Sequence, residues 1–480
     1  MCKLSLILLA FMLGGCIKPD YVEQYIETPE HWRMDAYEGS TLCNAQWWKQ
    51  FEDPVLDELV FVALNNNQDL QLAIYRVLEY YAKFKVVQSE LFPFLNGTGG
   101  YNRTQLSIAL PTAGQVIPSG PNTGFIRRFN DYNGLLNLNW ELDFWGQIQN
   151  ASAAAYADML SQVEARRAVV VTVVKSVVNG YILLRQLDAQ LEVSRQTVAS
   201  RLESYNLAKD RFHLGETSML EVIQAEAEME TAIIREIEYE RQIPQAENHL
   251  SILLGQNPRD IIRGKALNTF TYPFAIPAGL PSDLLRRRPD IVQAEQKLRS
   301  ANASVAEART LFFPQFTLTG FYGQESARLR DFLHFPANTW QYGLNFVQPI
   351  FNAGQIYYTV QEALAVRDEA LFFYKQTILN AFKEVEDSLI ATQTNQQLVK
   401  EHEKQVEILY VYLRLAKLRY SEGETDYLNV LDAERQLFDT QLQLVQSQAD
   451  NFNAVVDLYS ALGGGWVDDA DTAALQKFCE

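Results

Sequence analysis

An internal duplication constrains the fold of this chain more than any other feature of its sequence. Residues 207–226 align without gaps on residues 415–434, which lie 208 positions further on, and 11 of the 20 aligned positions are identical. Chance would give about one identity in such a window at average residue usage. Segments 69–93 and 290–314 form a second matching pair. The chain therefore consists of two tandem repeats, each predicted to fold as helix, strand pair, long helix, turn and helix.

Each repeat contains an interval that predicts a very long helix. Gly146 and Gly215 are 69 residues apart, as are Gly354 and Gly423, and both intervals lack proline and are rich in helix formers. At about 1.5 Å per residue, such a helix is roughly 100 Å long, several times the hydrocarbon thickness of a bilayer. A compact enzyme has no use for helices of this length.

The far end of each interval predicts a sharp reversal of the chain. Gly215 and Gly423 can each end a helix with a left-handed residue. In the first repeat, Ser218 has capping-box spacing to the glutamate three residues on; in the second, Thr425 or Asp426 can cap the returning helix.

Four segments show the two-residue period of strands. Residues 136–144 alternate apolar with polar side chains, 340–346 repeat this, 316–322 continue the style, and 94–108 is a weaker candidate. Strands of about ten residues suit a membrane barrel, although a soluble sandwich sheet shows the same alternation. A closed barrel takes about eight strands at minimum, and an open edge in lipid leaves backbone groups unsatisfied. A membrane barrel therefore has to be shared between subunits. The Pro- and Gly-rich segment 110–125 is predicted to be an external loop.

The N-terminus reads as a secretion signal. Lys3 precedes the apolar run 4–13, and Leu13-Gly14-Gly15-Cys16 resembles a bacterial lipobox, in which the cysteine becomes acylated. The alternative is a cysteine that lies near an ordinary cleavage site by chance. Lipid on Cys16 would tether the protein without crossing the membrane. Whether Cys43 and Cys479 form a disulfide stays open.

Composition excludes several classes of function. A net charge of −18 gives no electrostatic footprint for nucleic acid. The five histidines lie in unrelated contexts, and the sequence contains neither a cysteine–histidine cluster with metal spacing nor a phosphate loop. We expect no enzyme activity, no metal and no cofactor apart from covalent lipid. The apolar run 168–184 is interrupted by polar residues and is expected to be a buried helical segment rather than a membrane span.

Several motifs closely resemble those of the TolC/OprM outer-membrane efflux family, of the NodT-like subfamily. They are LPSDLLRRRPDI at 280–291 with Phe313-Pro314, Trp47-Trp48 with 51–54, the turn from Arg419-Tyr420 to Arg435, and ALGGGW at 461–466. The resemblance covers essentially the whole mature chain. It implies a mainly α fold with a transmembrane β-barrel: a homotrimer with a shared twelve-stranded barrel and an α-helical barrel reaching across the periplasm. It also implies a Gram-negative outer-membrane location, contact with outer-membrane lipid, a periplasmic adaptor and an inner-membrane transporter as partners.

Repeats and resemblance together predict a division of the chain into segments. The first repeat is expected to comprise a signal peptide (1–15), an N-terminal equatorial segment (16–64), a helix (65–92), two strands with an external loop (93–145) and a long helical hairpin (146–254). The second is expected to comprise an equatorial linker (255–287), a helix (288–312), two strands (313–353), a long helical hairpin (354–462) and a tail (463–480). The run Arg286–Arg288 is expected to be a solvated charge patch ahead of a helix that begins at Pro289.

Two sets of residues are predicted to carry function. The adaptor-docking tips are Gly215, Glu216, Thr217, Ser218, Gly423, Glu424, Thr425 and Asp426. The gate residues are Leu428, Asp432 and Arg435, which share one face of the returning helix, with Arg419 and Tyr420. The resemblance implies that this face constricts the closed tip, with Arg419 and Tyr420 holding it shut. The alternative is that Asp432 and Arg435 form an ordinary surface pair worth under about 1 kcal/mol.

The function predicted is that of the outer-membrane channel of a tripartite efflux pump, which conducts small molecules passively. Protein secretion and metal-ion efflux are alternatives that the same fold can serve. A non-conducting coiled-coil scaffold lipoprotein is an alternative from a different class, against which the strand pairs argue.

Overall fold

The computed structural model describes residues 28–29, 31–33, 46–105, 128–270 and 281–464. Cys16, Cys43, Cys479 and the predicted external loop lie outside these residues. Chain contacts divide the protein into two compact units. Among the described residues, the first unit comprises 79–105, 128–159 and 296–371, and the second comprises the rest. The boundaries between the two units fall within α-helices.

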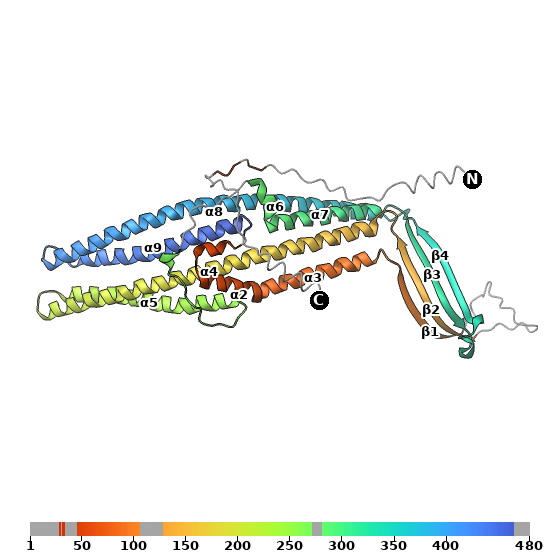
Figure 1. Ribbon diagram of the computed structural model, residues 1–480, viewed down its shortest axis with the longest axis horizontal. Coiled ribbons are helices and arrows are strands. Elements are labelled where there is room, and N and C mark those ends of the chain that lie inside the picture. The colour runs from red at the N-terminus through yellow and green to blue at the C-terminus, as the bar shows by residue number, and fades with distance from the viewer. Residues whose placement is uncertain (1–27, 30, 34–45, 106–127, 271–280, 465–480) are drawn as a thin grey trace, which may run out of the picture. The chain divides into compact units, whose positions relative to one another are not determined.

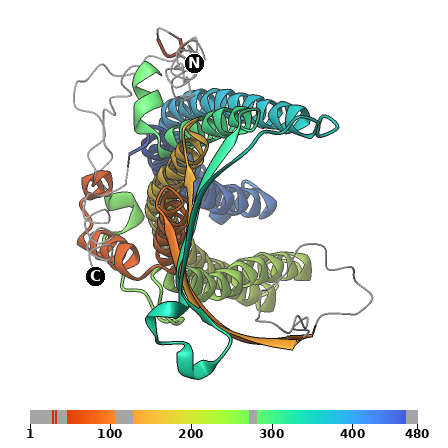
Figure 2. The same cartoon turned by 90° about the vertical axis from the view of Figure 1, so that its right-hand side faces the viewer.

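The first unit is built around a four-stranded antiparallel sheet of order β1-β2-β3-β4 (Figure 1). Its strands are β1 (Phe94–Gln105), β2 (Arg128–Leu142), β3 (Gln315–Ser326) and β4 (Asn338–Val347). The weaker candidate segment thus forms a full strand, paired with β2 from Phe94 to Gln105. Figure 2 shows the sheet as a curved surface. Among the described residues, β1 and β4 each have a neighbouring strand on one side only, so the sheet has two open edges.

The strand register gives the sheet one apolar and one polar face. Leu138 lies opposite Leu95 and Gly320, while the next residue of β2, Asn139, lies opposite Phe94 and Thr319. Because side chains alternate between faces, each row of partners belongs to one face. The apolar face includes Leu136, Trp140, Phe316, Tyr322, Trp340 and Phe346. The polar face includes Asn96, Asn137, Thr317, Thr319, Gln341 and Asn345.

Two helical hairpins dominate the second unit. α4 (Gln147–His213) returns as α5 (Met219–Leu253), and α8 (Gln355–Ser421) returns as α9 (Leu428–Ala461). The described residues of the two units also form shorter elements: η1 (Trp47–Phe51), α2 (Pro54–Asn66), α3 (Gln68–Ser89), η2 (Leu267–Thr269), η3 (Pro281–Asp283), α6 (Leu284–Arg287), α7 (Pro289–Thr310), η4 (Leu329–Asp331) and η5 (Phe335–Ala337). α4 and α8 are both 67 residues long, as the equal glycine spacing of the two repeats predicts.

The core of the second unit forms where the N-terminal segment meets α4 and α9. The run 168–184 of α4 is predominantly buried, with Val177, Val178 and Ile182 fully enclosed. By length and composition α4 could cross a membrane, but half of its most apolar stretch is buried in the protein, as expected for a core helix. Trp47 stacks on Tyr459 of α9 with ring centroids 5.0 Å apart. This stacking places the Trp47-Trp48 motif in the core.

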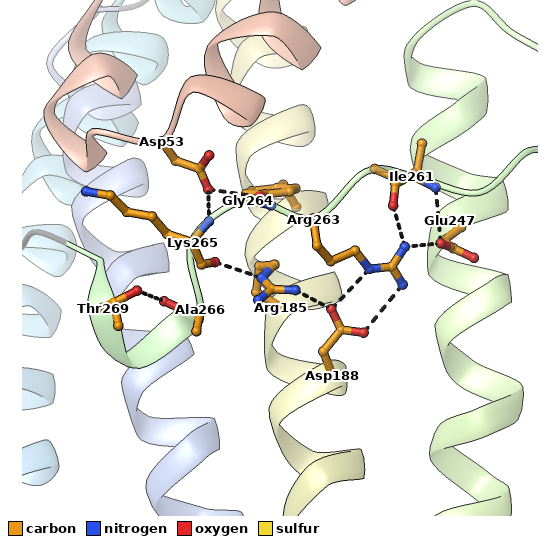
Figure 3. A network of polar contacts seen from close by, with 11 residues as sticks. Asp53, Arg185, Asp188, Glu247, Ile261, Arg263, Gly264, Lys265, Ala266 and Thr269 are labelled. Atoms are coloured by element: carbon orange, nitrogen blue, oxygen red, sulfur yellow. Dashed lines mark hydrogen bonds and ion pairs between the residues drawn. The ribbon is translucent and has the colours of Figure 1, made fainter.

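A polar network fastens the 261–269 segment to the helices (Figure 3). The buried Asp53 carboxylate accepts hydrogen bonds from the Tyr181 hydroxyl (2.8 Å) and the Lys265 backbone N–H (3.0 Å). Arg263 pairs with Asp188 of α4 and with Glu247 of α5. The linker therefore bridges the two helices of the first hairpin and holds the N-cap of α2.

Arg288 corrects the prediction of a solvated charge patch at 286–288. It is 7% exposed, and its guanidinium donates to Asp290 (2.8 Å), to Glu384 of α8 (2.7 Å) and to the carbonyl of Ala461 (2.9 Å). A buried charge requires such partners because desolvation is costly. Arg288 is therefore a structural joint between the start of α7 and the second hairpin, whereas Arg286 is exposed.

Candidate functional site at the helical tips

The two hairpins turn with the same backbone geometry. Gly215 and Gly423 both have φ of +78°, the left-handed stop predicted from the sequence. The N–H after each glycine, that of Glu216 or Glu424, donates to the carbonyl five residues earlier, at 2.8 and 2.9 Å. Each glycine N–H donates to the carbonyl three residues earlier, at 2.9 and 3.1 Å. These bonds define a Schellman motif at both tips.

The tips also repeat an ion pair. Arg211 lies 3.3 Å from Glu216, and Arg419 lies 3.3 Å from Glu424. Arg419 thus pairs within its own turn in the single chain, with both side chains well exposed. An exposed pair of this kind contributes about 0–1 kcal/mol to stability. The same ion pair therefore recurs at both tips, with the Arg211 side chain less exposed than that of Arg419.

The returning helices are not capped by the predicted side chains. Ser218 occupies the N-cap of α5 without a side-chain cap hydrogen bond, and the neighbouring Thr217 hydroxyl bonds the Glu221 carboxylate instead. The N-cap of α9 is Tyr427, which also makes no side-chain cap bond. The glutamate that would complete the capping box, Glu221, is instead bonded to Thr217 and Tyr420, and is therefore not available to the cap.

In the second tip, the two predicted capping residues serve the first turn of α9 in other ways. The Asn429 side-chain amide donates to the Thr425 hydroxyl. The Asn429 backbone N–H donates to the Asp426 carbonyl at 3.2 Å. The sequence therefore located the start of the helix but not the groups that satisfy its backbone.

A polar link at the tips is one of those that join the two hairpins of the chain. The Tyr420 hydroxyl of α8 donates to Glu221 of α5 at 2.8 Å, on the same carboxylate oxygen that bonds Thr217. The Arg211 guanidinium lies 4.8 Å from the centre of the Tyr420 ring. Burial first, and then the hydrogen bond to Glu221, raises the pKa of Tyr420 to about 12. The hydroxyl therefore stays protonated and remains a donor throughout the physiological pH range.

Apolar packing supports this link. A buried cluster draws residues from all four helices near the tips: Ala208, Val222, Ala225, Ala416, Tyr427, Val430, Leu431 and Ala433. Tyr205, Tyr412, Leu413 and Tyr420 pack against it. The small alanines let the helices approach closely, so the two hairpins of one chain meet through a common core at their tips.

The remaining predicted gate residues lie on the exposed side of α9. The Leu428 side chain is 63% exposed. Asp432 pairs with Arg435 at 3.0 Å and accepts a hydrogen bond of 2.6 Å from the Gln436 side chain. The single chain thus forms the surface pair that was the alternative reading of these residues. Both Asp432 carboxylate oxygens therefore have partners within the chain, while the Leu428 side chain is left open to other copies of the chain.

Sequence reasoning missed Glu221, Thr217 and Arg211 as partners of Tyr420. A signal was present in the repeat alignment, because the offset of 208 places Phe212 opposite Tyr420 and Asn429 opposite Glu221. The first repeat lacks the hydroxyl and the second lacks the carboxylate, so the two halves have diverged into complementary partners. Among the described residues, no cluster of histidine, cysteine and acidic side chains suits a metal ion.

These features define a class of protein. Long helical hairpins repeated twice, each repeat with a strand pair of one apolar and one polar face, are the architecture of outer-membrane channels with a helical extension. The sequence family described as "Outer membrane efflux protein" matches residues 59–256 and 280–464. The chain belongs to this family, which is a family of channels and not of enzymes.

Individual relatives agree over nearly the full length. The "Solvent efflux pump outer membrane protein SrpC" of Pseudomonas putida is 35% identical over 467 residues, covering 95% of this chain and 96% of SrpC. The "Probable outer membrane lipoprotein SilC" of Salmonella typhimurium is 30% identical, covering 97% and 99%. The crystal structure of the Campylobacter jejuni CmeC outer membrane channel matches with a TM-score of 0.85 at 26% identity and covers 96% of each chain. The predicted fold class, efflux function and outer-membrane location are thereby confirmed.

Proposed function

We propose that three copies of this chain form the exit duct of a tripartite efflux pump and work with a periplasmic adaptor and an inner-membrane transporter. The observation that carries the proposal is the four-stranded sheet, with its two open edges and its opposed apolar and polar faces. Four strands are fewer than the roughly eight of the smallest closed membrane barrels. Pairing β4 of one copy with β1 of the next satisfies both edges, and three copies give twelve strands.

The polar face would then line the pore. The Asn137 side-chain amide donates to the Thr98 hydroxyl across the strands at 3.0 Å, and that of Asn345 donates to Thr319 at 3.1 Å. This face therefore carries hydrogen-bonding side chains that suit contact with water. By register it also carries three carboxylates, those of Asp131, Glu141 and Glu325, and no lysine or arginine on the described parts of the strands. Such a lining favours cations over anions.

The direct test is conductance in planar bilayers, together with the mass of the detergent-purified complex. A trimeric mass and discrete cation-preferring pores are expected. A non-conducting scaffold would show no pores, even from tip variants designed to open. The name of SrpC, a solvent efflux pump protein, supports small organic molecules as cargo. Measuring which compounds accumulate after gene deletion would distinguish the export of small molecules from protein secretion and from metal-ion efflux.

The tips are proposed to dock the adaptor. Their matching Schellman turns and ion pairs mean that a trimer presents six similar turns. Ser218→Cys and Asp426→Cys should therefore both crosslink to an adaptor, with similar yields. Gln105→Cys, at the C-terminal end of β1, is the matched control and should not crosslink. The reverse pattern would show that the chain is oriented the other way.

The exposed side of α9 is proposed to form the gate. Three Leu428 side chains would form an apolar ring, and three Asp432 carboxylates an acidic ring that attracts cations. Leu428→Ala should enlarge the resting conductance, and Asp432→Ala should also weaken cation selectivity. Leu220→Ala, at the equivalent position of the first repeat, is the control. Unchanged conductance and selectivity in the Leu428/Asp432 double variant would place the gate elsewhere.

A further inference from the structure

The segment between β3 and β4 exposes large apolar side chains at the end of the sheet that lies away from the helices. It contains η4 and η5 and spans residues 327–337 (the teal segment at the end of β3 and β4 in Figure 1). Leu329, Leu333 and Phe335 are 67%, 81% and 85% exposed. An apolar cluster of this kind marks a contact with another molecule or with lipid.

One aromatic contact fixes this segment against the apolar face of the sheet. The Phe332 ring lies over Gly134 of β2, so closely that a Cβ at Gly134 would be 2.9 Å from the ring. Gly134 lies two residues from both Tyr132 and Leu136 on β2, and therefore belongs with them to the apolar face. The segment is thus held on the face that would meet lipid in the barrel, rather than on the face that would line the pore.

Positive charge collects at the same end and on the same face. Arg103 and Arg128 belong by register to the apolar face, and Arg328 and Arg330 lie in the segment itself. All four are exposed. The Arg128 side chain donates to Gln105 at 2.8 Å, and Arg330 lies 3.2 Å from Asp331 in an exposed pair.

The carboxylates of this end of the strands lie on the other face. Asp131 and Glu325 belong by register to the polar face. On the strands at this end, the two arginines therefore lie on the proposed lipid side and these two carboxylates on the proposed pore side, while Asp331 of the segment stays paired with Arg330. The neighbouring Tyr101 and Tyr132 rings, 4.7 Å apart on the apolar face, have the position of the aromatic girdle at a membrane interface.

We propose that this rim binds a phosphorylated glycolipid of the outer leaflet, with the arginines on its phosphates and the apolar side chains against its acyl chains. The proposal rests on the barrel proposed above, which places this end of the strands at the cell surface. Guanidinium groups bind phosphate through bidentate hydrogen bonds. Exposed Leu and Phe side chains gain favourable free energy when they are buried in the acyl region. A soluble protein partner would not require the arginines and the aromatic girdle on one lipid-facing surface.

The test is native mass spectrometry of the full-length, delipidated protein titrated with bisphosphorylated lipid A. The Arg328→Gln/Arg330→Gln variant should bind at least tenfold more weakly than the unmodified protein. Arg367→Gln/Lys383→Gln, which removes two cations from α8, one half-buried and one exposed, is the matched control and should leave binding unchanged. Dephosphorylated lipid A should bind the unmodified protein as weakly as intact lipid A binds the variant.

Single-channel conductance measured on the same preparations separates the two proposals. Pores with normal conductance but unchanged lipid binding in the arginine variant would overturn the glycolipid site and leave the duct intact. Equal binding of phosphatidylglycerol would also overturn it, by showing a general preference for anionic lipid. If the arginine variant does not assemble, Leu333→Ser/Phe335→Ser tests the acyl contact and should likewise weaken binding. Absence of pores from the unmodified protein would instead refute the proposed duct.

Discussion

Replacing Tyr420 by Phe should favour opening of the tip. The substitution removes only the hydroxyl that donates to Glu221 at 2.8 Å, and leaves the ring in its contacts with Tyr427 and Arg211. The new residue is the one that the first repeat carries at the equivalent position, Phe212. We hypothesise that the bond ties the two hairpins together in the closed tip and breaks on opening.

The size of the effect follows from the nature of the bond. A hydrogen bond to a charged group contributes about 1.5–3 kcal/mol, and the partial exposure of Tyr420 favours the lower end. At about 1.4 kcal/mol for each factor of ten, the loss of one bond raises the opening equilibrium roughly tenfold. If the three chains open together, the total of about 4.5 kcal/mol raises it by about three orders of magnitude.

Single-channel recording measures this equilibrium as the fraction of time spent in the larger conductance. Tyr410→Phe is the matched control, because the Tyr410 hydroxyl accepts a 2.6 Å hydrogen bond from Gln441 within one hairpin. That change should leave opening unaltered. A closed-state occupancy in Tyr420→Phe equal to that of the unmodified protein would refute the role of the bond. So would a Glu221→Gln variant whose effect adds fully to that of Tyr420→Phe, since partners in one bond cannot contribute independently.

Three further outcomes are expected. Mass spectrometry of the N-terminal peptide should show a diacylglyceryl thioether on Cys16, and an unmodified thiol would contradict the lipid anchor. The raised pKa of Tyr420 means that its contribution to stability is complete below the ordinary tyrosine pKa of about 10 and is lost as pH rises through about 12; channel opening should therefore increase only in that range, and an increase near pH 8 would implicate another group. Gly264→Ala places a Cβ 2.1 Å from the Asp53 carboxylate and should lower stability by about 1–3 kcal/mol in thermal unfolding, whereas Gly97→Ala, with open space, should change it by no more than about 1 kcal/mol.

The sequence was most informative where structure depends on local chemistry. Two pairs of glycines, each pair 69 residues apart, predicted both long helices, which have 67 residues each, and both left-handed turns, because a helix end is decided by a few neighbouring residues. Segment 94–108 was the weaker strand candidate, yet Phe94–Gln105, which contains three glycines, pairs with β2 along its full length. Pairing with a neighbouring strand outweighed its low intrinsic preference for strand.

The contacts that the sequence did not reveal join residues far apart in the chain. Tyr420 and Glu221 are separated by 199 positions, and Arg288 and Ala461 by 173. No local pattern distinguishes the buried Arg288 from its exposed neighbour Arg286, since the difference arises only when the second hairpin packs beside it. Comparison of the two repeats position by position is the one sequence signal that points to the Tyr420 partner.

The two open edges of the sheet also constrain the biogenesis of the protein. In the aqueous periplasm, a lone chain exposes an apolar sheet face and unpaired strand edges, both of which promote aggregation. In the bilayer, the same edges would leave N–H and C=O groups without partners. We therefore expect insertion and trimerisation to be a single coupled event, with the lone chain shielded by a chaperone until then. Pulse-chase labelling should detect no long-lived monomer in the membrane fraction, and a stable inserted monomer would show that the edges are satisfied in another way.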